Sequence, residues 1–469
     1  MPVVVRNSTN SRGISECGRI GVAIFCCVIA FSTHAAGQEA AEQAPATPAP
    51  APAAESDEAA RQAAATKENV PANCVQQVLA EQQLTRTLRE MREPLPYPDK
   101  NEAARLRRDY TKLLSDGFTN AADTTKVQQY LEWQLLRVTE SDFIENPGNV
   151  QQLLKDIESD VQRAGANIGN PANQLTARKK FCGEVLTIGR KLLSNNFDAR
   201  VACISILKAL HEVRAVPGGA PAKLYPEALA TLLDILNSKE QPDSVKVFVA
   251  SALRNVLRNC DVIETEQFRI CDAVAAELAR SCTQSAYQQT LLETLFDVRR
   301  ARKTVGGAEP TVMKSFAAVL DDRSRPVEVR CLAAMGIGRG AFDNQMRLDP
   351  LAWKIAQLAG DAAVEFNRSP GDSKWPACGA SLIFAFRHVT NEEATAALLD
   401  RKGLLNRSGG TAPSKIISEA APLVKVVGLK LIENGDSIAP DDVRPLAEWI
   451  QSNRPESLKW DDKAPDLTP

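Results

Sequence analysis

Apolar residues recur at helical spacing in segments that repeat along most of this chain. In the segment YPEALATLLDILN, Leu229, Leu232, Leu233 and Leu236 stand at i, i+3, i+4 and i+7. This spacing places all four on one face of a helix. A second segment of helical pattern, PDSVKVFVASALRNVL, follows after a short polar break. The pattern therefore predicts pairs of helices joined by short turns.

The second helices of such pairs can be aligned in six units. The shared positions are 46, 42, 42, 46 and 46 residues apart, and they are Ala199, Val245, Tyr287, Val329, Trp375 and Ala421. Because one helix pair cannot cover its own apolar face, units with this period stack and share an elongated core. We therefore expect an all-α fold, a right-handed α-solenoid of about six two-helix repeats preceded by a helical subdomain.

One unit carries a recognisable sequence. The segment RPVEVRCLAAMGIG, Arg325–Gly338, resembles the second helix of a HEAT repeat, with Pro326 at its start and a Val-Arg pair after it. Small residues follow at Ala333, Ala334 and Gly336, and they allow neighbouring helices to approach closely. The resemblance implies stacked helix pairs and, since such arrays mostly bind other macromolecules, a binding role.

The segments on either side of the repeats differ in character. Residues 169–453 are assigned to the repeats, and residues 72–168 to an N-terminal helical subdomain whose breaks do not match their period. Residues 38–71 form an Ala/Pro-rich stretch with too few large apolar side chains to bury a core, so we expect a flexible linker. Residues 454–469 are expected to be a loose C-terminal tail. Two strand-like segments, VKVFV and PLVKVVGLKLI, are predicted to be helical from their place in the repeat.

The N-terminus has the layout of a secretory signal peptide, assigned to residues 1–37. Three arginines precede a run of 13 apolar residues, Ile20–Ser32. Thr33 and Ala35 fit a cleavage site, as do Ala35 and Gly37. The run is shorter than the about 20 residues that a membrane-spanning helix needs, although an uncleaved anchor is the alternative. We expect an exported protein (periplasmic, secreted or attached to the cell envelope) with no membrane span after cleavage.

Charge and composition narrow the ligand classes. The formal net charge is −2 and aromatic residues make up 5%, which disfavours nucleic acid as a partner. The chain has three histidines, and no cofactor motif or metal site is predicted. His211 and His388 are expected near helix C-termini, where an imidazolium is favourable. The GIGRG segment is interpreted as a helix end with a left-handed glycine, and the pairs Asp321-Asp322 and Asp461-Asp462 as solvated acids.

Eight of the eleven cysteines follow the signal peptide, an even number that permits disulfides in an exported chain. If residues 266–280 form one helix, Cys271 and Cys282 lie about 16 Å apart along it and should not pair. Cys260 precedes that helix and could reach Cys271, so a Cys260–Cys271 disulfide is the predicted link. Three further cysteines stand among apolar residues and are either buried thiols or halves of disulfides; they are Cys203, Cys331 and Cys378.

We expect a non-catalytic scaffold that binds a protein partner along its second helices, without a cofactor. Polar residues on those helices are the candidate contacts, and they are Arg254, Gln288, Arg299, Arg330 and Arg387. The alternative is an all-α hydrolase acting on the cell envelope, which would need carboxylates from several repeats to converge. Three long loops could host that site, namely Pro217–Lys223, Phe366–Lys374 and Asn406–Lys415.

Overall fold

The chain folds almost entirely into helices. A computed structural model describes residues 72–91, 93–216, 218–280, 284–302, 309–343, 345–387, 403–406 and 413–469. Within these ranges the strands are two short segments, β1 (His211–Val213) and β2 (Lys223–Leu224), which pair antiparallel. The all-α expectation is confirmed. The predicted signal peptide at 1–37 lies outside the described residues, as does the linker at 38–71.

The N-terminal part of the described chain is helical, as predicted. Its elements are α3 (Ala72–Glu90), α4 (Lys100–Asp116), α5 (Ala121–Leu136), η1 (Arg137–Thr139), α6 (Ser141–Ile144) and α7 (Pro147–Arg163). Helix α5 contacts α8 (Pro171–Gly189), and α7 contacts α9 (Phe197–Ala209). The N-terminal helices thus pack directly onto the first of the expected repeats.

Asp and Asn side chains cap the N-termini of most of these helices. In five of the six helices from α4 to α9 the residue before the first turn accepts a hydrogen bond from a backbone N–H of that turn. These residues are Asp99, Asn120, Asn146, Asn170 and Asn196. Each satisfies a donor that the helix cannot pair internally, which is worth about 1 kcal/mol per cap.

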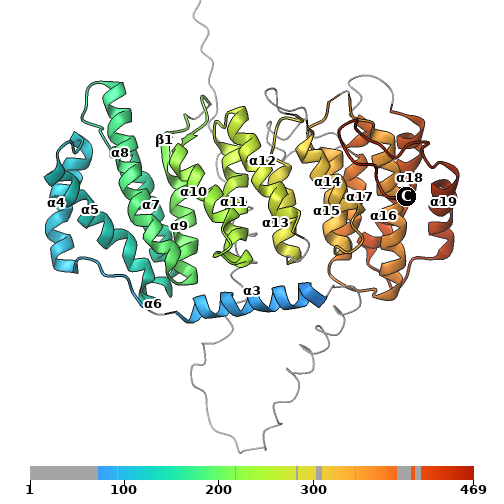
Figure 1. Ribbon diagram of the computed structural model, residues 1–469, viewed down its shortest axis with the longest axis horizontal. Coiled ribbons are helices and arrows are strands. Elements are labelled where there is room, and N and C mark those ends of the chain that lie inside the picture. The colour runs from blue at the N-terminus through green and yellow to red at the C-terminus, as the bar shows by residue number, and fades with distance from the viewer. Residues whose placement is uncertain are drawn as a thin grey trace, which may run out of the picture. The chain divides into compact units, whose positions relative to one another are not determined.

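The rest of the chain continues as consecutive helices. They are η2 (Arg190–Ser194), α10 (Pro226–Asn237), α11 (Asp243–Asn259), α12 (Glu264–Leu278), α13 (Ser285–Leu295), α14 (Thr311–Asp321), α15 (Val327–Arg339), α16 (Leu348–Arg368), α17 (Trp375–Phe386), η4 (Leu404–Asn406), α18 (Lys415–Glu433) and α19 (Pro440–Ser452). Figure 1 shows these helices side by side, with α3 crossing one set of their ends. This arrangement is compatible with a helical repeat fold.

The helices contact one another in two series. One series, the inner row, consists of α9, α11, α13, α15, α17 and α18, and each member contacts the next. The other, the outer row, consists of α10, α12, α14 and α16, again in sequential contact. All six aligned positions fall in the inner row and are buried. The strand-like segments are helical as predicted and lie in α11 and α18, because burial between neighbouring helices outweighs local β propensity.

Glycines set the closest approaches in the inner row. A Cβ added at Gly338 of α15 would stand 2.2 Å from the carbonyl oxygen of Ala385 in α17. One added at Gly379 of α17 would stand 2.3 Å from the Gly428 carbonyl oxygen in α18. The predicted role of small residues in close packing extends to Gly336, where an added Cβ would stand 2.5 Å from Phe316.

The GIGRG segment ends a helix, but without the expected left-handed glycine. Helix α15 runs to Arg339, and the capping residue Gly340 has φ −65° and ψ 169°, which is extended backbone. Close packing rather than turn geometry therefore explains Gly336 and Gly338.

The C-terminal residues pack against the helices, so the expectation of a loose tail is wrong. Trp460 is 1% exposed, and its carbonyl oxygen accepts the backbone N–H of Arg347 at 2.7 Å. Asp461 is buried and forms an ion pair with Arg302. Burial of an indole and a paired carboxylate fixes a segment whose Pro-rich, charged sequence resembles a free terminus.

Candidate functional site

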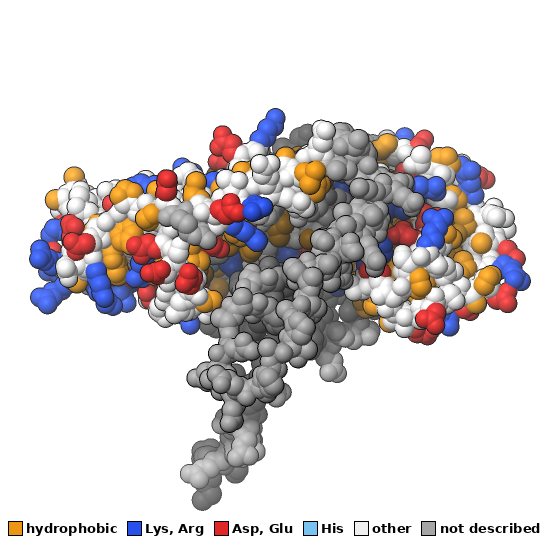
Figure 2. All heavy atoms as spheres, turned by 90° about the horizontal axis from the view of Figure 1, so that it is seen from below, with side chains coloured by type: hydrophobic (Ala, Val, Ile, Leu, Met, Phe, Trp, Pro, Cys, Tyr) orange, Lys and Arg blue, Asp and Glu red, His pale blue; other side chains and the backbone are white. Residues whose placement is uncertain are grey.

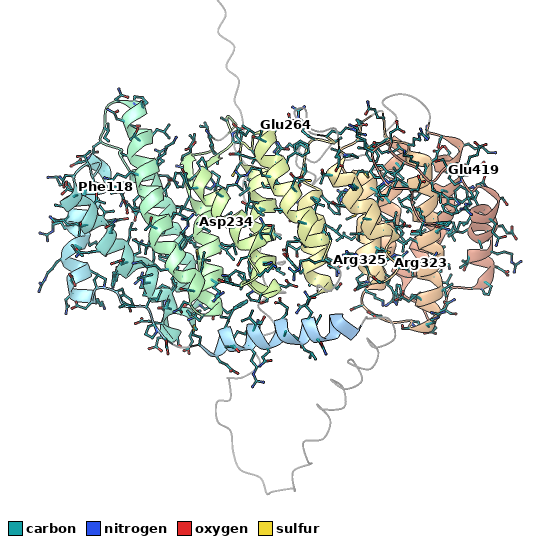
Figure 3. The ribbon with its side chains drawn as sticks, in the orientation of Figure 1. Phe118, Asp234, Glu264, Arg323, Arg325 and Glu419 are labelled. Atoms are coloured by element: carbon teal, nitrogen blue, oxygen red, sulfur yellow. The ribbon has the colours of Figure 1, made fainter. Side chains whose placement is uncertain are left out.

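Two of the five candidate contact residues are buried parts of the fold rather than available surface. Gln288 is 1% exposed, and its amide oxygen accepts an N–H of the Arg325 guanidinium at 2.8 Å. Arg330 is 9% exposed and donates to the Leu320 carbonyl oxygen at 3.1 Å. Figure 3 labels Arg325, whose guanidinium also donates to the Leu278 carbonyl oxygen at 2.6 Å. These side chains tie adjacent helices together.

The other three candidates lie closer to the surface. Arg254 is half-buried and pairs with two carboxylates of the α13 region, with Nε 3.4 Å from Asp297 Oδ2. Arg299 is exposed, although its guanidinium donates to the Leu257 carbonyl oxygen at 3.1 Å. Arg387 is exposed directly after α17. Arg299 and Arg387 are therefore the two exposed candidates, and both follow a second helix rather than standing on it.

The Cys260–Cys271 disulfide stays a prediction. Cys260 and Cys271 are both buried thiols, and Cys260 Sγ lies 3.7 Å from His211 Nε2. His211 stands in β1 directly after Leu210, the C-cap of α9, so its expected place near a helix C-terminus is confirmed. Burial lowers the pKa of its ring, which disfavours the charged imidazolium there. His388 and Cys282 lie outside the described residues.

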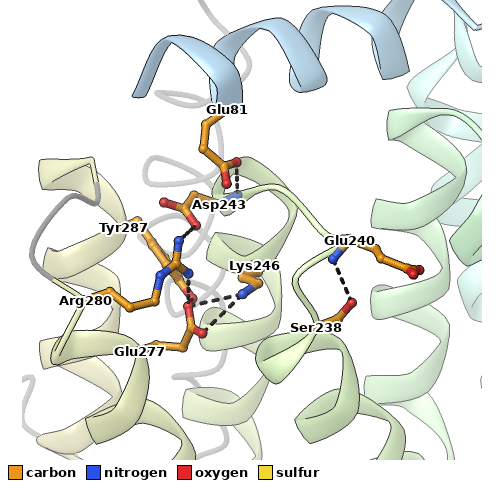
Figure 4. A network of polar contacts seen from close by, with 8 residues as sticks. All are labelled: Glu81, Ser238, Glu240, Asp243, Lys246, Glu277, Arg280 and Tyr287. Carbon is orange, nitrogen blue, oxygen red and sulfur yellow. Dashed lines mark hydrogen bonds and ion pairs between the residues drawn. The ribbon is translucent and has the colours of Figure 1, made fainter. Parts of the chain in front are cut away.

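A buried charged network joins α11, α12 and α13 (Figure 4). We define it as Asp243, Lys246, Glu277, Arg280 and Tyr287. Lys246 Nζ lies 3.2 Å from both carboxylate oxygens of Glu277, and the Tyr287 hydroxyl donates to Glu277 at 2.8 Å. Arg280 pairs with Glu277 and, at 3.2 Å, with Asp243. Because these charged groups are withdrawn from water, each is stabilised mainly by its partners. Removal of one partner leaves an unpaired buried charge and lowers the free energy of unfolding.

Helix α3 is attached next to this network. The Glu81 carboxylate accepts the backbone N–H of Asp243 at 3.0 Å, at the first residue of α11. Thr85 and Ser244 share a hydrogen bond of 2.8 Å. Since Pro242 stands before α11 and offers no capping oxygen, Glu81 supplies the acceptor from a distant part of the chain. A negative charge at a helix N-terminus is also favoured by the helix dipole.

The surroundings of Asp243 raise the pKa of its carboxyl and so make it a weaker acid. Burial and, to a smaller extent, the nearby Glu81 charge raise the pKa of its carboxyl to about 6, against the lowering effect of Arg280. The pKa of the Tyr287 hydroxyl is raised well above its usual range, mainly by burial and then by Glu277. Tyr287 therefore acts as a hydrogen-bond donor at all ordinary pH values, whereas Asp243 titrates near neutrality.

The paired aspartates do not form a catalytic pair of carboxylates. Asp321 lies 2.8 Å from Lys354 Nζ, and Asp322 pairs with Arg325 at 3.0 Å. Asp461 is bound by Arg302, whereas Asp462 is largely exposed. The expectation of solvated acids is thus wrong for the first three, which are held by cations of the fold.

A hollow near α16, α18 and the C-terminal segment contains carboxylates from separate elements. Asp349 and Glu456 both line it. The Asp349 carboxylate accepts a hydrogen bond from the Ser414 hydroxyl. One of its oxygens therefore already has a partner within the chain. The loop 366–374 is shorter than expected because α16 extends to Arg368.

Two surface regions stand out, one for its basic side chains and one for its exposed apolar side chains. A shallow hollow on α4 is lined by Ala104, Arg107, Arg108, Thr111, Lys112, Ser115 and Asn167. Figure 2 shows Lys and Arg side chains gathered at the end of the molecule where α4 lies. At the other end of the helix series, α18 exposes an apolar stripe of Val426, Leu429 and Ile432, each 40–41% exposed.

Across the described ranges no group of three or more His, Cys, Asp or Glu side chains is arranged to hold a metal ion. No helix in the same ranges has both the length and the apolar character needed to cross a bilayer. Comparison with protein-family models, curated proteins and solved structures finds no match to this chain.

The sequence reading missed the charged network, although one signal was available. Lys246 directly follows the buried position Val245 inside an apolar second helix, and Glu277 ends an otherwise apolar face of α12. Charged residues inside apolar stripes are expected to be paired. Their partners, however, come from different helices and cannot be chosen from spacing alone.

Proposed function

We propose that the chain is an exported, non-catalytic scaffold that binds a protein partner along the second helices of a right-handed, HEAT-like α-solenoid of about six helix pairs. The observation that carries this proposal is the pair of helix series. Sequential contacts within the inner row and within the outer row are the arrangement expected of stacked two-helix units. Helix α19 contacts both α16 and α18, which supports its role as an end cap.

The proposed binding role rests on the extended surface that stacked helical repeats expose to solvent. Stacked repeats expose an extended row of helices, each contributing a few side chains to a common surface. Arg299 and Arg387 are exposed just beyond the C-terminal ends of α13 and α17, two members of the inner row. The support for a protein partner is the balanced charge of the chain and its low aromatic content, which suit neither a nucleic acid nor a stacking ligand.

The export proposal rests on the N-terminal sequence. Basic residues, a short apolar run and a small-residue cleavage site occur in the order of a secretory signal.

Affinity capture with paired charge-reversal variants tests the binding role. The full chain is expressed in its native host, and its exported fraction is cross-linked, captured and analysed by mass spectrometry. R299E/R387E changes two exposed residues just beyond the inner-row helices α13 and α17, and R269E/R368E makes the same charge change on exposed residues of the outer helices α12 and α16. We expect a protein that wild type and R269E/R368E retain and R299E/R387E loses. Equal retention by both variants, or no specific protein with wild type, would overturn the proposal.

A further inference from the structure

Helices α15 and α17 approach each other closely at a glycine. An added Cβ at Gly338 would lie 2.6 Å from both the Cα and the carbonyl carbon of Ala385. Cys331 and Cys378 have the same sequence offset as Gly338 and Ala385, seven residues earlier on each helix. Seven residues are about two helical turns, so the two cysteines lie on the same faces that meet at the glycine.

The two thiols lie in contact across this interface. Cys331 is 0% and Cys378 1% exposed, both are thiols in the structure, and the Cys378 side chain is near enough to raise the pKa of Cys331. A disulfide requires Cα atoms about 4.4–6.8 Å apart and Cβ atoms that face each other. The glycine contact brings α15 and α17 close together, and the equal offset places Cys331 and Cys378 on the two faces that meet.

We propose that Cys331 and Cys378 form a disulfide that links the α15 and α17 units when the folding chain meets a disulfide oxidant. The inference rests on the proposed export, because such oxidants act in oxidising compartments. One thiol, as its thiolate, attacks an oxidant RS–SR and releases RS⁻. The second displaces the remaining RS⁻ from the mixed disulfide, so two cysteine thiols lose two electrons and two protons to form two RSH.

Burial determines when this step occurs. Desolvation raises the pKa of the Cys331 thiol well above its usual value, and the Cys378 neighbour raises it further. The thiolate is therefore scarce in the folded chain, and the exchange takes place before the two helices close. Once formed, the bond is shielded from reductants by the same packing.

The proposed disulfide would stabilise the contact between the α15 and α17 units. It closes a chain segment that contains all of α16 and joins two units whose contact otherwise depends on side-chain packing. In stacked repeats each junction contributes separately to stability, so a covalent bond there reinforces the C-terminal units specifically. Closing a long segment also lowers the entropy of the unfolded chain.

Peptide mapping tests the pairing directly. The reduced, unfolded full chain is refolded in a glutathione redox buffer, trapped with N-ethylmaleimide and digested with trypsin. Each cysteine falls in a peptide with no other cysteine, CLAAMGIGR and WPACGASLIFAFR. We expect one linked species two hydrogen atoms lighter than the sum of the two peptides. Recovery of both as maleimide adducts from natively folded protein would overturn the pairing.

A second arm uses chain trapped with N-ethylmaleimide in its native host. If the peptides are linked after refolding but alkylated when the chain is trapped in cells, the two cysteines can pair and the pairing is supported. The same result would contradict export, because the chain has then not met an oxidising compartment. Alkylated peptides from chain shown to be exported would contradict the pairing.

Thermal unfolding supplies the matched control. Because packing shields the bond in the folded chain, wild type is reduced while unfolded and refolded in dithiothreitol, and we expect its Tm to lie about 5 °C below that of oxidised wild type. C331A/C378A should show no such response, whereas C203A, which removes another buried thiol, should retain it. A response that survives in C331A/C378A would assign the sensitivity to other cysteines and overturn the proposal.

Discussion

Replacement of Gly338 by alanine tests whether backbone contact between α15 and α17 holds the inner row together. The new methyl group would stand 2.2 Å from the Ala385 carbonyl oxygen. An ordinary contact is about 3.5 Å, so the two helices must separate by roughly 1 Å along their interface. Overpacking of this kind costs about 1–3 kcal/mol, against a gain of about 0.5–1 kcal/mol from replacing a helical glycine. The difference is a net loss, and we expect G338A to lose about 1 kcal/mol.

The matched control is the same substitution where space is open. At Gly360 in α16 the nearest atom to an added Cβ is Ile450 Cδ1 at 3.9 Å. G360A should therefore gain about 0.5–1 kcal/mol. Urea unfolding followed by circular dichroism measures both through the shift in midpoint at constant slope. If G338A is as stable as wild type, or if both variants lose stability equally, the proposed backbone contact is wrong.

Four further outcomes follow from the packing, the charged network and the N-terminus. K246M removes the ammonium partner of buried Glu277 and should cost about 3 kcal/mol in urea unfolding, with part of the loss recovered in K246M/E277Q; an unchanged midpoint would show that the pair contributes nothing. Because the folded-state pKa of Asp243 is raised to about 6, its protonation favours folding below the unfolded value near 4, and this contribution is lost as pH rises through 6. The stability difference between wild type and D243N should thus shift against wild type between pH 5 and pH 7, and a constant difference would contradict the burial argument. W460A should lose about 3–5 kcal/mol because the indole is buried, whereas a loose terminus would leave stability unchanged. N-terminal sequencing of exported protein should give a first residue of Ala36 or Gln38, and an intact Met1 would contradict cleavage.

The sequence predicted the helices well because their signal is local. Leucines at helical spacing mark α10, and small residues mark the close packing of α15. Even the strand-like residues of α18 were correctly assigned, because their place in the period outweighs local propensity.

The partners of polar side chains could not be predicted in the same way. Arg330 looked like surface, yet it is buried because the helix before it presents the Leu320 carbonyl oxygen. Glu81 caps α11 from a position 162 residues earlier in the chain, a separation that no local pattern encodes. Trp460 was overlooked because its charged neighbours are typical of a free terminus. In each case the missing information is which distant element lies opposite, and tertiary packing alone supplies it.

Site-specific photo-cross-linking on the full chain in its native host tests the central claim most directly. A photoreactive residue is placed in turn at the two inner positions Arg299 and Arg387, just beyond α13 and α17, and at Arg269 and Arg368 on the outer row. The account predicts that one exported protein is cross-linked from both inner positions and from neither outer position. Cross-linking from the outer positions alone, or no specific adduct at any of the four, would contradict a scaffold that binds its partner along the second helices.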